Sequence, residues 1–332
     1  MHLYELTKTL ISIPSITGEE SAIADYLHAF LSEHGFEVMQ QTVEGPRRNL
    51  LARTAAEPRV VLCTHLDTVP PFLAAREDSR RIFGRGACDA KGILAAMICA
   101  ALALRRQGVS RFALLFLVGE ETDSLGARAA NRLGVRSDYI VVGEPTENKL
   151  GVGHKGLVSV RLTAKGKSAH SAFPELGDSA IQKLLEALER VRRTRFGSDP
   201  VLGESGLNFG TLSGGVAHNV IPDHAEATLS IRNTVPSEQA IATLEEAVPE
   251  GVEVEVLSSS EPQRLHTLPG YETTVLPFGT DIPHLRSFGK ALLVGPGSAT
   301  VAHTPEEHIG KRQLTAAVDL YVNLVKQLLE EP

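Results

Sequence analysis

The sequence has no tryptophan and only three cysteines, Cys63, Cys88 and Cys99, among its 332 residues. Their number is odd and no two of them form a Cys-x-x-Cys pair, which argues against a disulfide framework or a zinc ribbon and favours a reducing, cytoplasmic compartment. No apolar run reaches the roughly 18 residues needed to cross a bilayer, so we expect no membrane partner. The first residues lack a basic n-region and include Glu5, so we expect no signal peptide.

Clusters of positive charge are also scarce. The formal net charge is −7, and lysines and arginines do not gather on a glycine-rich or aromatic-rich background, which argues against a nucleic-acid partner. The basic stretch at 190–195 is interpreted as the end of a helix, where cations complement the helix dipole. The remaining composition is that of a soluble globular protein, long enough for two domains.

The first half of the sequence alternates between predicted strands and helices. Thr17 and Glu20 are interpreted as a capping box ahead of a helix. Further helices are predicted at 92–106 and 124–133, and strands at 37–43, 49–53, 60–63, 112–118 and 139–142. The last three strands are uniformly apolar, which is typical of a mostly parallel sheet covered by helices on both faces.

The pattern changes after residue 156. The next predicted elements follow the order β-α-β-β-α-β of a ferredoxin-like unit, at 158–164, 178–191, 208–212, 225–232, 237–247 and 252–257. The predicted fold class is therefore α/β, with a mostly parallel-sheet domain covered by helices and an inserted ferredoxin-like α+β domain. We place the first domain at 1–155 and 262–332, and the inserted domain at 156–261.

Imidazole and carboxylate side chains follow the apolar strands of the first domain. His65 and Asp67 come after one strand, Glu120 and Glu121 after another and Glu144 after a third, while Asp89 lies in a glycine-rich turn. Ligands of parallel sheets bind beyond the carboxyl ends of the strands. Several carboxylates at one sheet edge repel one another unless a cation neutralises them. Carboxylate and imidazole donors without thiolate suit zinc, manganese or cobalt, and a bridging carboxylate suits two metals.

The motifs around these residues make the resemblance specific. They are THLDTVP (64–70), GRGACDAKG (84–92), GEET (119–122), VVGEPT (141–146), HKG (154–156), SAHS (168–171), HNVIP (218–222), GTD (279–281) and AHTPEE (302–307). In these motifs and their order the sequence resembles the M20-type co-catalytic metallohydrolases, which include acetylornithine deacetylase, succinyl-diaminopimelate desuccinylase, aminoacylase and the glutamate carboxypeptidases. The family fold is a catalytic α/β domain with an inserted ferredoxin-like lid, in agreement with the pattern above.

The resemblance implies two divalent metal ions, Zn²⁺ first and Co²⁺ or Mn²⁺ as alternatives. Asp89 would bridge them, His65 and Glu144 would complete one set of ligands, and Glu121 and His303 the other. Two further residues would support the chemistry. Asp67 would accept the second ring N–H of His65, and Glu120 would be the general base.

The same resemblance assigns roles beyond the metals. His170 of the lid would stabilise the developing oxyanion from a partner subunit, so we expect a homodimer formed through the lid domain. Substrate would be held by Asn219, Arg232, Thr280 and Gly297. One departure concerns residues 262–278, which show no amphipathic helix where family members usually have one of about four turns.

These features predict a metal-dependent hydrolase of the amide bond of a small N-acyl amino acid. Deacetylation of N-acetylornithine, or of a related N-acyl basic amino acid, is the first choice, because VVGEPT, HKG and THLDTVP are most similar to that branch. Succinyl-diaminopimelate desuccinylase, dipeptidase and aminoacylase activities remain alternatives with the same mechanism. An inactive relative that only binds ligands is a remote alternative, because no catalytic position is lost.

Overall fold

The computed structural model describes residues 2–54 and 57–331 of the chain, which divides into two compact units. The first consists of Met1–Val152, Leu265–Thr274 and Thr280–Pro332, and the second of Gly153–Arg264 and Val275–Gly279. The second unit is thus inserted into the sequence of the first. Each unit has its own apolar core.

The first unit contains a six-stranded sheet with the order β1-β2-β6-β3-β7-β17. The strands are β1 (Glu37–Glu44), β2 (Arg47–Arg53), β3 (Val60–His65), β6 (Phe112–Leu117), β7 (Tyr139–Val142) and β17 (Lys290–Leu293). Strands β6, β3, β7 and β17 run parallel, whereas β1 and β2 form an antiparallel edge. Every residue of β3, β6 and β7 is buried, which explains why these segments are apolar on both faces.

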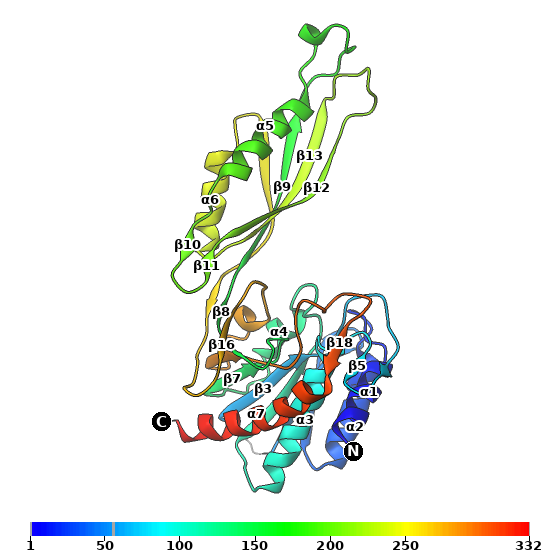
Figure 1. Cartoon of the computed structure of the whole chain (residues 1–332), viewed down its shortest axis with the longest axis vertical. Helices are drawn as coiled ribbons and strands as arrows, with labels where there is room; N and C mark the ends of the chain where they lie inside the picture. The colour runs from blue at the N-terminus through cyan, green and yellow to red at the C-terminus, as the bar shows by residue number, and fades with distance from the viewer. Residues whose placement is uncertain (1, 55–56, 332) are drawn as a thin grey trace. The chain divides into compact units, whose positions relative to one another are not determined.

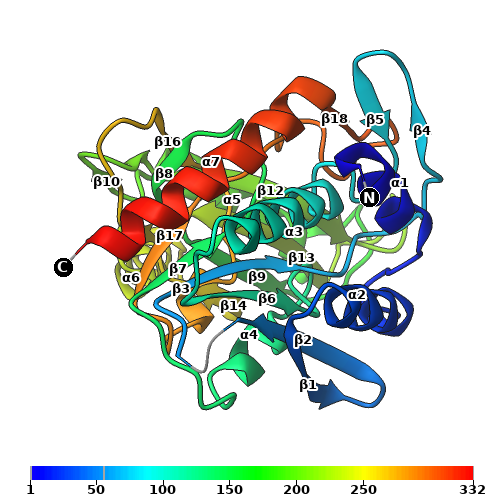
Figure 2. The ribbon, with the colours of Figure 1, turned by 90° about the horizontal axis from the view of Figure 1, so that it is seen from below.

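Helices bury both faces of this sheet. The helices of the unit are α1 (Leu3–Ser12), α2 (Ser21–Glu33), α3 (Lys91–Arg106), α4 (Leu125–Ala130) and α7 (Lys311–Glu330), with a short 3-10 helix η2 (Ile282–His284). Helices α3 and α7 lie side by side over the sheet (Figure 2) and share one core with α1 and α2. Helix α4 packs against β1, β2 and β6, and it also contacts η2. A small sheet, β18-β5-β4, joins His308–Gly310 to Arg81–Phe83 and Arg76–Glu77.

The second unit is a four-stranded antiparallel sheet with two helices on one face (Figure 1). Its order is β12-β13-β9-β14, with β9 (Leu157–Lys165), β12 (Gly206–Gly214), β13 (His224–Arg232) and β14 (Val252–Ser260). The covering helices are α5 (Ala180–Arg193) and α6 (Ser237–Ala247). This is the ferredoxin-like order, so the predicted fold class is confirmed. The unit also contains η1 (Pro174–Leu176) and a β10-β11 hairpin (Ser198–Asp199, Gly203–Glu204).

The predicted capping box is wrong. Helix α2 begins at Ser21, and its N-cap residue Glu20 makes no capping hydrogen bond with its side chain. The Glu20 carboxylate instead accepts two hydrogen bonds from Arg47, at 3.0 and 2.8 Å. Thr17 donates its hydroxyl to Asp67, at 2.8 Å. The side chains of Thr17 and Glu20 therefore form tertiary hydrogen bonds, which a local sequence pattern does not reveal.

Two further segments bear on the sequence predictions. The helix predicted at 124–133 is shorter, because α4 ends at Ala130. All of residues 262–278 are described and none is helical, as expected. They contribute β15 (Gln263–Arg264) and β16 (Thr273–Leu276) to a sheet with β8 (Leu150–His154). Among the described residues, no helix is both long and apolar enough to cross a membrane.

A pair of glycine substitutions tests the turn that leads into β17. Gly289 and Gly108 both have positive φ, at +64° and +72°, but a Cβ on Gly289 would lie 2.2 Å from the Asp138 carbonyl oxygen while Gly108 has open space. We expect Gly108→Ala to lower the free energy of unfolding by about 1–2 kcal/mol through the left-handed backbone alone. Gly289→Ala should lower the free energy of unfolding by about 1–3 kcal/mol more than Gly108→Ala, because the backbone at Asp138 or at residue 289 must shift to admit the new Cβ. Urea denaturation of both variants measures the difference, and equal losses would contradict the close approach.

Candidate metal centre

The sheet brings three polar segments to one edge. His65 is the last residue of β3, Glu120 and Glu121 follow β6, and Glu144 follows β7. Since β6, β3 and β7 are parallel neighbours, their carboxyl ends meet at the same edge. His65 and Glu144 are buried, and the Glu121 side chain is only 6% exposed.

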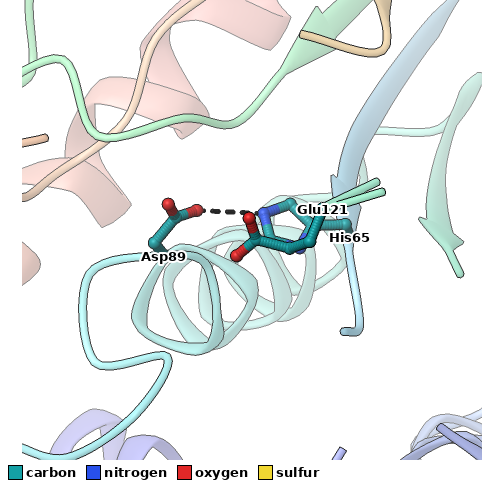
Figure 3. Close-up of side chains that lie close together, drawn as sticks. All are labelled: His65, Asp89 and Glu121. Carbon is teal, nitrogen blue, oxygen red and sulfur yellow. Dashed lines mark hydrogen bonds and ion pairs between the residues drawn. The ribbon is translucent and has the colours of Figure 1, made fainter. Parts of the chain in front are cut away.

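Asp89 reaches this edge from the loop that precedes α3. Its Oδ1 lies 3.0 Å from His65 Nε2, and Figure 3 shows the two side chains facing each other beside Glu121. One ligand atom from each of His65, Asp89 and Glu121 lies within 4.8 Å of the others, a spacing that could hold one metal ion. A cis peptide bond joins Asp89 to Ala90.

His303 approaches from the C-terminal part of the chain. Its backbone has a left-handed φ of 62°, which is uncommon for a residue with a side chain. Its Nε2 lies 3.3 Å from Asp89 Oδ2 and 3.0 Å from Glu121 Oε2. Asp89 therefore presents one carboxylate oxygen to each imidazole, which is the arrangement needed of a bridging ligand.

Asp67 fixes the neighbouring loops. Its carboxylate accepts the backbone N–H groups of Glu120 (3.1 Å) and Glu121 (3.2 Å) and the hydroxyl of Thr17. The ring Nδ1 of His65 lies 2.9 Å from the carbonyl oxygen of Asp67 but 3.6 Å from its carboxylate. The predicted partner, the Asp67 carboxylate, therefore lies within ion-pair distance of the ring, and the carbonyl of the same residue lies closer. Either acceptor leaves Nε2 of His65 for a metal.

The electrostatics of the cluster show an excess of buried negative charge. Burial raises the pKa of Glu120 and of Glu144 well above the ordinary value, and neighbouring carboxylates raise both further. Burial acts against the charged imidazole of His65, yet hydrogen bonds to Asp67 and Asp89 raise its pKa well above normal. Hydrogen bonds to Asp89 and Glu121 raise the pKa of His303 to about 10. Carboxylates crowded in this way are stabilised either by protons or by a bound cation.

The donor set fits a divalent metal. It consists of two imidazoles and carboxylate oxygens. The thiol next to Asp89, that of Cys88, points its sulfur toward Ser298 O and Glu307 Oε1, at 3.8 and 3.7 Å. Nitrogen and oxygen donors without sulfur suit zinc, manganese or cobalt. Glu144 forms no ion pair or hydrogen bond with the described residues through its side chain, so its buried carboxylate is available as a further donor.

Two of the predicted lid residues lie together in the second unit. His170 forms an isolated bridge with Val220, and the Ser171 N–H donates to the Asn219 carbonyl at 3.0 Å. Both His170 and Asn219 are exposed. Arg232 is at the opposite end of β13, which begins at His224, so it does not belong to this pair.

Arg232 is a cation that burial has partly removed from water. Its guanidinium makes no hydrogen bond or ion pair with any residue in 2–54 or 57–331. Burial lowers its pKa below the ordinary value for arginine. A partly desolvated guanidinium of this kind is suited to binding an anion with two hydrogen bonds.

The remaining predicted substrate residues lie in the first unit. Thr280 is buried, and its hydroxyl accepts the Ile282 N–H at 3.2 Å. Gly297 has a φ of +94°, and a Cβ there would lie 2.6 Å from Cys88 Cβ. Its lack of a side chain therefore lets the 295–297 loop approach the turn that carries Asp89. Substrate contact by either residue stays a prediction.

Sequence reasoning missed three buried polar residues near the centre. Arg85 and Glu307 form an ion pair beneath the Asp89 loop, and both lie inside motifs whose other members received roles. Asp281 is buried with one carboxylate oxygen unpaired, and burial raises its pKa to about 7. Their presence within the GRGACDAKG, AHTPEE and GTD motifs was the available signal.

Comparison with known proteins agrees with this architecture. The family described as the peptidase dimerisation domain matches residues 152–254. A peptidase M20 domain-containing protein of Schizosaccharomyces pombe is 38% identical over 98% of this chain and 84% of its own. A probable carboxypeptidase of Aspergillus clavatus is 38% identical over 99% of this chain and 83% of its own.

Two solved structures share the fold at lower identity. A tripeptidase of Staphylococcus aureus has a TM-score of 0.84 and 21% identity, and covers 99% of this chain and 98% of its own. A dinuclear metal binding peptidase of Bacillus subtilis has a TM-score of 0.73 and 17% identity, covering 99% of this chain and 98% of its own.

The fold and the site together define a metallohydrolase that acts on linear amides. The chain belongs to the M20 peptidase family, as the resemblance of its motifs predicts.

Metal removal should lower the stability of the protein and its metal content. We expect EDTA treatment to lower the melting temperature, and zinc at a thousand times its Kd to restore about 4 kcal/mol of stability by binding only the folded state. Elemental analysis of the reloaded protein should give two metals per chain. The Asp89→Asn variant is the control and should hold fewer. A melting temperature indifferent to both EDTA and zinc would contradict a metal centre.

Proposed function

We propose that the protein hydrolyses the amide bond between an acyl group and an amino acid that has a free α-carboxylate. N-acetylornithine, or a related N-acyl basic amino acid, is the first candidate substrate, on the sequence similarity described above. A short peptide that loses its C-terminal residue is the second, favoured by the description of the Aspergillus clavatus relative as a probable carboxypeptidase. The two substrates share the same scissile unit and differ only in the acyl group and side chain.

The observation that carries the proposal is the position of Asp89 between two imidazoles. Its two oxygens lie 3.0 Å from His65 and 3.3 Å from His303. In the proposed centre two divalent ions would be held by His65, Asp89, Glu121, Glu144 and His303, with Asp89 shared between the His65–Glu144 and Glu121–His303 ligand sets. When bound, divalent ions such as zinc would lower the pKa of water and polarise the amide carbonyl.

Glu120 has the role of proton carrier in this proposal. Its backbone N–H is fixed by Asp67, and its carboxylate lies beside the ligands without a hydrogen bond to His65 or His303 among the described contacts. It would take a proton from the attacking water and return it to the leaving amine. The amine leaves as part of the released amino acid.

Arg232 is proposed to bind the α-carboxylate of that amino acid. The guanidinium is partly buried and unpaired among the described residues, so a carboxylate would restore the hydrogen bonds lost on burial. A free α-carboxylate is present both in N-acyl amino acids and at the C-terminus of a peptide, so Arg232 could bind either substrate.

His170 and Arg232 of one chain are too far apart to hold the same small substrate. Between His224 and Arg232, β13 extends about 27 Å at a rise of ~3.4 Å per residue, and His170 lies beyond the His224 end. If both residues act on one substrate, they come from different copies of the chain. The match to the peptidase dimerisation domain supports a homodimer of this kind.

A cytoplasmic location is part of the proposal. All three cysteines are unpaired, and Cys63 and Cys88 are buried. Free thiols persist in reducing compartments.

A substrate panel tests the reaction. We expect turnover of N-acetylornithine above N-acetylcitrulline, succinyl-diaminopimelate, acylated hydrophobic amino acids and short peptides. Each substrate should lose most of its turnover when its α-carboxylate is amidated. Arg232→Lys should raise KM for the carboxylate forms by roughly tenfold, because one of two parallel hydrogen bonds is lost. Equal rates on acid and amide forms would contradict the carboxylate assignment, and a preference for peptides would select the second candidate.

Mixed subunits test the role of His170. We expect Glu120→Gln and His170→Ala each to be inactive while both retain metal. Mixing them under subunit exchange should restore about a quarter of wild-type activity, because half of the dimers are mixed and each has one complete site. The matched control is His224→Ala mixed with Glu120→Gln, since His224 is an exposed histidine of the same unit outside the proposed site. Activity that never recovers in the His170 mixture would place His170 outside a shared site.

A further inference from the structure

A buried ion pair lies beneath the loop that carries Asp89. Arg85 Nη1 lies 2.5 Å from Glu307 Oε2, and the two side chains are 2% and 0% exposed. Burying such a pair costs desolvation energy and is favourable only when the remaining donors and acceptors find partners. The positions of those partners indicate what the pair holds in place.

The second oxygen of Glu307 receives the backbone of the Asp89 loop. Glu307 Oε1 accepts the N–H groups of Cys88 and of Asp89, each at 3.3 Å. The backbone N–H of Asp89 therefore donates to a charged carboxylate, which makes a stronger hydrogen bond than a neutral acceptor would.

The same pair also holds the segment that follows His303. Arg85 Nη1 reaches the Thr304 carbonyl at 3.5 Å, and the Glu307 N–H donates to that carbonyl at 3.3 Å. The Gly84 N–H donates to the Glu307 carbonyl at 3.1 Å, and β18 pairs with β5 directly afterwards. The loop at 84–89 and the segment at 303–307 are thus joined through Arg85 and Glu307.

We propose that Arg85 and Glu307 are positioning residues that set Asp89 and His303 at the separation required for metal binding. The inference rests on the proposed metal centre, because it concerns two of its ligands. His303 Nε2 is 3.3 Å from Asp89 Oδ2, although the two residues belong to distant parts of the sequence. The ion pair links the backbone of Asp89 to that of Thr304, the residue after His303, so its loss should change metal affinity as well as stability.

A second buried pair supplies a matched control. Glu20 has a fully buried side chain and accepts from Arg47 at 2.8 and 3.0 Å, with Arg47 10% exposed. Among the described residues, neither Glu20 nor Arg47 forms a hydrogen bond with Asp89 or His303. Glu20→Gln therefore removes the charge of a buried pair without touching the Asp89 loop.

The experiment compares metal binding by the wild type, Glu307→Gln and Glu20→Gln. Each protein is stripped of metal and titrated with zinc against a chromophoric chelator, and the cobalt-loaded forms are compared by visible absorption. We expect Glu307→Gln to bind zinc about 10–100-fold more weakly, as is typical when a partner of a metal ligand is lost. Its cobalt spectrum should change because the ligand geometry changes. Glu20→Gln should match the wild type in both measurements while its melting temperature falls.

If Glu307→Gln does not fold, Arg85→Lys is the second test variant. The lysine keeps the charge next to Glu307 but cannot also reach the Thr304 carbonyl, so zinc affinity should fall less than in Glu307→Gln and the cobalt spectrum should still shift.

Three results would contradict the proposed role of the ion pair, and each result has a different cause. Zinc affinity and a cobalt spectrum unchanged in the folded Glu307 or Arg85 variant would show that the pair only stabilises the fold. An equal loss of affinity in Glu20→Gln would assign the effect to general destabilisation. Failure of the wild type to bind either metal would remove the proposed metal centre, and this inference with it.

Discussion

The structure of the first unit depends on one electrostatic constraint: several carboxylates are buried at the edge of a parallel sheet. Asp67 is stabilised by hydrogen bonds from the Glu120 and Glu121 backbone, and Asp89 lies between two histidines. Glu120 and Glu144 have no comparable partners, and their pKa values are raised accordingly. The apolar strands β3, β6 and β7 supply the rigid scaffold that holds these groups together. The same three strands therefore form the centre of the core and position the residues of the candidate site.

Much of the architecture could be predicted because its signals are local. Uniformly apolar stretches identified the central strands to within one or two residues, and α6 begins and ends at the predicted positions. The approximate location of the site also followed, since parallel strands bring their carboxyl ends to one edge. The M20 resemblance then identified His303, which no rule of sheet topology would have connected with Asp89.

The parts that could not be predicted depend on contacts through space. Thr17 and Glu20 have the spacing of a capping box, yet Asp67 and Arg47 compete successfully for their side chains. The pairing of Arg85 with Glu307 joins positions separated by most of the chain, so the motifs that contain them do not reveal that they are partners. Likewise, the carbonyl of Asp67 lies closer to His65 Nδ1 than its carboxylate does, and the carboxylate also accepts backbone N–H groups of the loop after β6.

The insertion of the second unit has a consequence for biosynthesis. His65, Asp89, Glu121 and Glu144 precede the inserted unit in the chain, whereas His303 and Glu307 follow it. Domains generally begin to fold while the chain is still being made. A nascent chain that has completed the inserted unit still lacks His303, the Glu307 acceptor for the Asp89 loop, and strand β17 at the edge of the sheet. The proposed ligand set is thus complete only after the inserted unit has been synthesised, so all five proposed ligands would be available to a metal only after that point.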